Sequence, residues 1–259
     1  MENLGASLTW GLIIGASLVL GAVGAARLRL PARVAATLTA FGGGILLAAI
    51  ALELVPEADR QAGGALTASG LLAGTLVYVA ADAWLGRDKQ TIATRRFGHA
   101  AAAGRPMLMP TSTPTGSAEV MRGESIAVGL FVDGVPESLA LGLTIAEGEL
   151  GIALLTGVVV ANIVEAYGAA QPIIAGGRKP SFAIALLTSI GLALAIATVL
   201  GGTVLADAGG ALVGTAQAIA GGAVLAVVSI AIVPHAFSEV NRLVATATVA
   251  GFIAGYLLS

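Results

Sequence analysis

The strongest constraint on the fold is a series of eight apolar stretches, each close to the length that a helix needs to cross a bilayer. A hydrocarbon core about 30 Å thick requires about 20 such residues, and a helix satisfies its own backbone polar groups without water. The chain is 57% hydrophobic and only 11% charged, whereas soluble domains carry about 25% charged residues. We therefore expect an all-α polytopic membrane protein with eight transmembrane helices, at about 7–26, 34–56, 65–85, 124–147, 150–175, 181–203, 210–234 and 241–258.

Basic residues predict the orientation of these helices. Of the 13 Lys and Arg residues, all except Arg60 fall in the loops on one side of the predicted bundle. Loops rich in Lys and Arg stay in the cytoplasm. Both termini are therefore expected outside, and the short termini and compact length favour a bacterial inner (cell) membrane.

One connection is much longer than the others. Residues 87–123 are rich in Gly, Pro, Ser and Thr, a composition typical of disorder, so we expect a flexible cytoplasmic loop. It divides the chain into helices one to three (1–86), the loop (87–123), helices four and five (124–176) and helices six to eight (177–259). The chain has no cysteine, which excludes disulfides and thiolate metal sites.

Helices four and five carry acidic residues where hydrocarbon is expected. Asp133 and Glu137 lie in the fourth stretch and Glu165 in the fifth. An ionised side chain at the centre of a membrane helix costs at least about 2.5–3.5 kcal/mol. A bound cation is the simplest partner that offsets this cost.

The depths of these acids match. Asp133 lies nine residues after Glu124, and Glu165 lies nine residues before Ile174, so both are about 13 Å from the same membrane face. Glu137 follows Asp133 by four positions, and Glu165 follows Asn162 by three. Residues three or four positions apart lie on the same face of a helix. Asp133, Glu137, Asn162 and Glu165 are therefore predicted to form an oxygen-rich site between the two helices. Pro136 adds a freed backbone carbonyl there.

An internal repeat is also indicated. Residues 41–58 match residues 219–236 at an offset of 178, and the predicted topology gives the two segments opposite directions, as in the inverted repeats of secondary transporters. The repeat places Glu53 and Glu57 at the outer mouth and His235 and Glu239 at the inner mouth of a candidate cation pathway. The alternative is that Glu57 and Glu239 are interfacial charges in water and that His235, next to Pro234, is a helix-end residue, whereas Glu53 lies one turn deeper. The coinciding residues are Gly43/Gly221, Gly44/Gly222, Leu47/Leu225, Ala48/Ala226, Val55/Val233, Pro56/Pro234 and Ala58/Ala236.

Three short motifs resemble those of the ZIP family of divalent metal ion transporters. Asp-Gly-Val-Pro-Glu-Ser at 133–138 resembles the fourth-helix motif His-Asn-x-Pro-Glu-Gly. Ala-Asn-Ile-Val-Glu-Ala at 161–166 resembles the fifth-helix motif His-x-x-x-Glu-Gly, and Leu-Val-Pro-Glu-Ala at 54–58 resembles the end of the second helix. The eight helices, the outside termini, the long loop and a 3+2+3 inverted repeat also fit that family.

The resemblance implies a metal site at Asp133, Glu137 and Glu165, with Asn162 as a fourth ligand. This chain is a divergent member by that comparison, because Asp133 and Ala161 replace the family's histidines. Oxygen ligands suit Mn²⁺ better than imidazole sites do, so Mn²⁺ or Fe²⁺ are expected beside Zn²⁺ as the transported substrate, with no organic cofactor. The expected partners are metal ions and the lipid bilayer, not nucleic acid, and a homodimer is left open.

The leading hypothesis is thus a secondary transporter that moves divalent metal into the cytoplasm by alternating access. One alternative is a non-transporting homologue that acts as a metal sensor or membrane scaffold. Another is a proton-coupled carrier of another cation, since midplane acids also relay protons. An enzyme is not expected, because the chain has neither a His-Glu-x-x-His nor a Gly-x-Ser-x-Gly motif.

Overall fold

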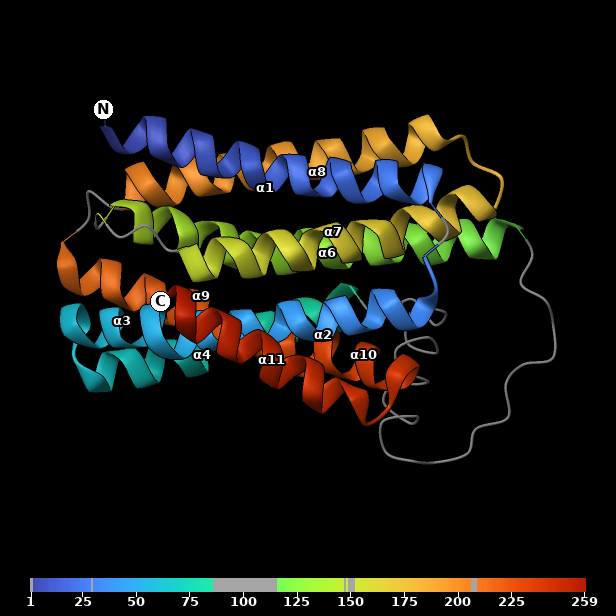
Figure 1. Cartoon of the computed structure of the whole chain (residues 1–259). Coiled ribbons are helices and arrows are strands. Elements are labelled where there is room, and N and C mark those ends of the chain that lie inside the picture. Colours follow the sequence, from blue (N-terminus) through green and yellow to red (C-terminus); the bar gives the residue numbers. More distant parts are fainter. Residues whose placement is uncertain (1, 29, 86–115, 147, 149–151, 206–208) are drawn as a thin grey trace.

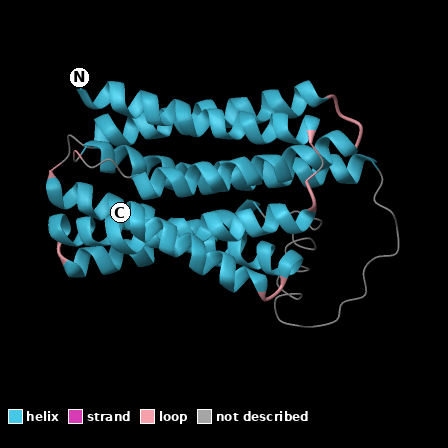
Figure 2. Cartoon of the chain, in the orientation of Figure 1, coloured by secondary structure: helices cyan, strands magenta, loops and turns pink. Residues whose placement is uncertain are grey.

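The computed structural model describes residues 2–28, 30–85, 116–146, 148, 152–205 and 209–259. These residues form helices joined by short loops, and no strand occurs among them (Figure 2). The all-α class is therefore confirmed. The helices are α1 (Glu2–Arg27), α2 (Ala32–Ala49), α3 (Val55–Ala62), α4 (Gly64–Leu85), α6 (Gly116–Ala146), α7 (Ile152–Ala175), α8 (Pro180–Leu200), α9 (Gly210–Val227), α10 (Val233–Val240) and α11 (Leu243–Leu258). The π-helical turns η1 (Ile50–Leu54), η2 (Gly201–Leu205) and η3 (Val228–Ile232) continue α2, α8 and α9.

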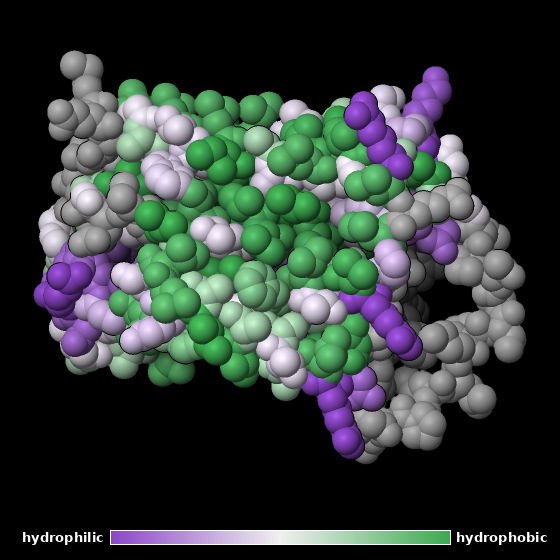
Figure 3. All heavy atoms as spheres, in the orientation of Figure 1, coloured by the Kyte–Doolittle hydropathy of each residue, from purple (hydrophilic) through white to green (hydrophobic). Residues whose placement is uncertain are grey.

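The described residues have the character of an integral membrane protein. Seven helical stretches are long and apolar enough to cross a membrane, and Leu243–Leu258 is a shorter apolar helix. These eight stretches correspond to the eight predicted spans. Figure 3 shows an apolar band across the middle of the molecule, with hydrophilic residues towards the two ends.

Several boundaries differ from the predicted ones. The second span continues through η1 and α3 to Ala62, and the seventh through η3 and α10 to Val240. Hydropathy detected only the apolar part of these two spans. In the second span the undetected part is α3 (VPEADRQA), which is charged and strongly amphipathic. α6 begins at Gly116, so residues 116–123 of the predicted loop are helical. The remainder of that loop, 87–115, lies outside the described residues.

Helices α6 and α7 form the centre of the bundle (Figure 1). They contact each other along their length. On one side lie α1 and α8, with α1 against α7 and α8 against α6. On the other side α2 contacts α7 and α9 contacts α6, while α11 and α4 pack outside α2 and α9. The acids of α6 and α7 are therefore carried by the two helices that lie between the outer sets.

The element boundaries in the two outer sets of helices coincide at an offset of 178. Adding 178 to the bounds of α2, η1 and α3 gives the bounds of α9, η3 and α10, and adding it to α1 gives the span of α8 plus η2. The matched helices run in opposite directions: α1 runs from left to right in Figure 1, and α8 runs back from right to left.

Glycines allow close contact between the paired helices. A Cβ atom added at Gly74 in α4 would lie 1.9 Å from the carbonyl oxygen of Ile219 in α9, and one at Gly222 would lie 2.0 Å from that of Leu71. Gly11 and Gly15 of α1 have a similar role against α8, since a Cβ atom at Gly11 would lie 2.9 Å from Cα of Ala195 and one at Gly15 would lie 3.1 Å from the Gly191 carbonyl oxygen. Small residues let membrane helices approach until their backbones touch.

Candidate functional site

The four predicted site residues lie on the central helices. Asp133 and Glu137 are on α6, and Asn162 and Glu165 are on α7. The exposed fractions of Asp133, Glu137 and Asn162 are 9%, 3% and 2%, and Glu165 is half-buried. Charged and amide side chains are seldom buried this deeply unless they are paired or functional.

Packing of α6 fixes the direction of its acids. Gly134 lies against Leu194 of α8, and Gly142 meets the Thr198 carbonyl of the same helix. The face of α6 that carries Gly134 and Gly142 is therefore turned to α8, and Asp133 lies one position round the helix. The helix runs through Pro136 without interruption.

Asp133 has a partner on a third helix. The hydroxyl of Tyr78 in α4 donates a hydrogen bond of 2.5 Å to Oδ1 of Asp133, and both side chains are buried. O–H···O⁻ bonds to a carboxylate fall in the range of about 2.5–2.7 Å and are roughly twice as strong as neutral ones. This bond ties an outer helix to the acid at the centre of the bundle.

The predicted face of α7 is directed at α6. Asn162, Glu165 and Ala169 are spaced three and four residues apart and so share one face. The carbonyl oxygen of Ala169 lies 2.5 Å from the position of a Cβ added at Gly123 of α6, which places that face against α6. The amide nitrogen of Asn162 is buried without a hydrogen-bond partner in the described part of the chain.

The structure brings the three carboxylates into electrostatic range of one another. Glu137 interacts with both Glu165 and Asp133, and Glu165 interacts with Asp133. Among the described residues, however, no three His, Cys, Asp or Glu side chains are arranged as a group that could hold a metal ion. The site is therefore an open set of oxygen donors on facing helices rather than an assembled coordination shell.

Tyr78 was missed by the sequence reasoning. It follows Gly70 and Gly74 at a spacing of four on the buried stripe of α4. A tyrosine that continues a small-residue stripe is the signal that could have placed a polar group against the bundle centre.

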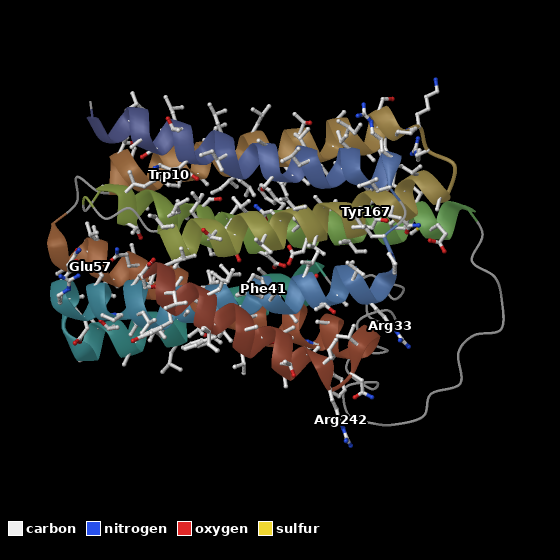
Figure 4. All side chains as sticks on the ribbon, in the orientation of Figure 1. Trp10, Arg33, Phe41, Glu57, Tyr167 and Arg242 are labelled. Atoms are coloured by element: carbon white, nitrogen blue, oxygen red, sulfur yellow. The ribbon has the colours of Figure 1, made fainter. Side chains whose placement is uncertain are left out.

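The two predicted mouths are described to different extents. Glu53 lies half-buried in η1, and Glu57 lies in α3 at the left end of Figure 4. Glu57 forms an ion pair with Arg60 and accepts a hydrogen bond of 2.7 Å from Gln61, as expected of an interfacial charge. Positions 235 and 239 lie in α10, but the side chains of His235 and Glu239 are outside the described part.

At the end of the bundle opposite Glu57, Tyr167 of the central helix α7 forms hydrogen bonds with the loop between α1 and α2 (Figure 4). Its hydroxyl accepts a hydrogen bond of 2.8 Å from the Leu30 amide and donates one of 3.3 Å to the Leu28 carbonyl. Arg33 and Arg242 lie at this same end of the molecule (Figure 4).

Neither models of known protein families nor curated protein sequences match this chain.

Proposed function

We propose that this protein is a secondary transporter that moves divalent metal cations into the cytoplasm by alternating access. The observation that carries the proposal is the burial of Asp133, Glu137 and Asn162 on the two central helices of an apolar bundle. With Glu165 they offer carboxylate and amide oxygens, the donors preferred by hard divalent cations. The motif resemblance to ZIP transporters supports the same assignment. Zn²⁺, Mn²⁺ and Fe²⁺ are the proposed substrates.

We further propose that the bundle is a 3+2+3 inverted repeat. The coincidence of element boundaries at an offset of 178 supports it, as do the opposite directions of α1 and α8. In transporters built this way the substrate site lies near the midplane between the repeats. In this bundle α6 and α7 lie between the two outer sets of helices.

Cation binding would draw the facing donors together. The carboxylates are within electrostatic range but are not grouped as a ligand set. A cation with higher affinity for a closed arrangement shifts the population towards it. Movement of α6 and α7 relative to the outer helices is then the step that changes access.

A proton-coupled carrier of another cation is the second candidate. The absence of an assembled three-residue metal group among the described residues favours it, because proton relays need acids but no coordination shell. Competition by divalent metals separates the two candidates. Metal ions block substrate uptake if the site is a metal site and leave it unchanged otherwise.

The test is uptake of Zn²⁺, Mn²⁺, Fe²⁺ and Cd²⁺ into proteoliposomes, with the wild type beside Glu165→Gln. We expect saturable uptake of at least one ion by the wild type. Removing one charged ligand should reduce uptake at least tenfold, because hydrogen bonds and ion contacts of a buried charge are worth about 1.5–3 kcal/mol. The matched control is Asp59→Asn, since Asp59 is an exposed acid of α3. Metal binding without flux would instead identify a sensor or scaffold.

A further inference from the structure

Tyr78 lies with Gly70 and Gly74 on the narrow buried stripe of an otherwise peripheral helix. Most of the apolar window of α4 is exposed on the bundle surface, with only 22% of it buried. Tyr78 itself is 3% exposed. Its hydroxyl lies 2.5 Å from Oδ1 of Asp133 on the central helix α6.

Close packing of α4 on α9 brings the phenol within reach of α6. Gly70 and Gly74 meet Ala218 and Ile219 of α9 at distances that exclude a side chain. Thr75 adds a hydrogen bond of 3.0 Å to the Gly222 carbonyl. Tyr78 comes one helical turn after Gly74, so the position of its hydroxyl is set by this rigid contact and not by a flexible loop.

We infer that Tyr78 is a positioning residue that makes the proposed cation site discriminate against large cations. The inference rests on the proposed function. The phenol holds Oδ1 of Asp133, so a cation that chelates Asp133 through both oxygens must compete with this hydrogen bond. A cation bound through one oxygen of Asp133 does not require its loss.

The consequence differs between cations. Ca²⁺ collects six to eight oxygens and often takes carboxylates in bidentate fashion, whereas Mn²⁺ needs only an octahedral set of six. Loss of the phenol should therefore help Ca²⁺ more than Mn²⁺. A residue that served packing alone would change the two affinities in parallel.

The test is Mn²⁺ binding to the purified full chain in detergent, followed by the electron paramagnetic resonance of free Mn²⁺, with Ca²⁺ as competitor. Tyr78→Phe should strengthen Ca²⁺ competition relative to Mn²⁺ affinity by about tenfold, the order expected for one hydrogen bond to a charged group. The matched control is Tyr256→Phe, because Tyr256 lies exposed on α11. It should leave the ratio unchanged.

A second pair of variants guards against a merely structural effect. In an Asp133→Asn background, Tyr78→Phe should no longer change the Ca²⁺/Mn²⁺ ratio, since the two residues act as one coupled pair. The inference is wrong if Tyr78→Phe leaves the Ca²⁺/Mn²⁺ ratio unchanged, or if it changes the ratio equally in the wild-type and Asp133→Asn backgrounds. Either result would leave the proposed transport function unaffected. Absence of binding of either cation to the wild type would overturn the proposed function and this inference together.

Discussion

At the scale of single residues, two buried polar groups near the bundle centre have no hydrogen-bond partner in the described part of the chain. They are the amide nitrogen of Asn162 and the hydroxyl of Ser138. Leaving a buried donor unsatisfied costs about 1–3 kcal/mol. Stability alone would favour an apolar residue at either position. At position 162 the oxygen of the amide is a ligand of the proposed cation site.

Asn162→Leu should therefore separate stability from function. The nearly isosteric side chain removes the unpartnered donor, so the thermal midpoint in detergent should stay the same or rise. Cation uptake by proteoliposomes should fall at least tenfold, because an oxygen ligand is lost. An equal loss of stability and uptake would mean that Asn162 is a structural residue.

Ser138→Ala provides the comparison. Ser138 is fully buried and lies between Gly134 and Gly142 on the face of α6 that meets α8, away from Asp133. Its replacement should also keep or raise the thermal midpoint, and uptake should remain at the wild-type level. Reduced uptake in this variant would place part of the site on the α8 side of α6.

At the scale of helices, the pairing of α4 with α9 depends on two glycines, Gly74 in α4 and Gly222 in α9. Each lies against a backbone carbonyl of the opposite helix. Gly74→Ala and Gly222→Ala would each place a methyl group about 2 Å from a carbonyl oxygen. Overpacking of this kind costs about 1–3 kcal/mol. We expect a lower thermal midpoint for both variants, measured by the unfolding of detergent-solubilised protein.

Gly168→Ala in α7 is the control for the same chemical change. A Cβ atom there would meet nothing within 4 Å. Alanine is the better helix former by about 0.5–1 kcal/mol, so this variant should be as stable as the wild type or more stable. A loss equal to that of Gly74→Ala would contradict the assignment of close packing to the α4–α9 contact.

The positions of the helices could be predicted from the sequence, but the π-helical turns within them could not. Apolar length located the spans, and the spacing of Gly70 and Gly74 located a helix contact. The π-helical turns η1 and η3, which directly precede the Val-Pro pairs at 55–56 and 233–234, were not predicted. In both turns a valine amide donates a hydrogen bond to the carbonyl five residues back.

The candidate site was predictable in part for a similar reason. Helical spacing needs only local geometry, and it put the predicted donors on two helices, α6 and α7, that contact each other in the structure. It could not find Tyr78, which reaches Asp133 from 55 residues away in sequence. Such a contact depends on how α4 packs against α9. The distances among the carboxylates likewise depend on tertiary packing that no local pattern contains.

At the scale of the whole molecule, the charge distribution and the matched halves predict one topology. Arg33 and Arg242 lie at one end of the bundle, and Glu57 lies at the other (Figure 4). Basic ends face the cytoplasm. The helices matched at an offset of 178 run in opposite directions, which supports the proposed inverted repeat. On this proposal the end that carries α3 should face outside.

Single cysteines can test this orientation, because the natural chain contains none. Asp59→Cys in α3 and Ser259→Cys at the C-terminus should react with a membrane-impermeant maleimide added to intact cells. Lys179→Cys, before α8, should react only after the membrane is permeabilised. All three positions are exposed, so a difference in labelling reports sidedness and not burial. The reverse pattern would place the basic end outside and contradict the proposed direction of transport. If Asp59→Cys and Lys179→Cys were labelled from the same side, the two ends of the bundle would not lie on opposite sides of the membrane.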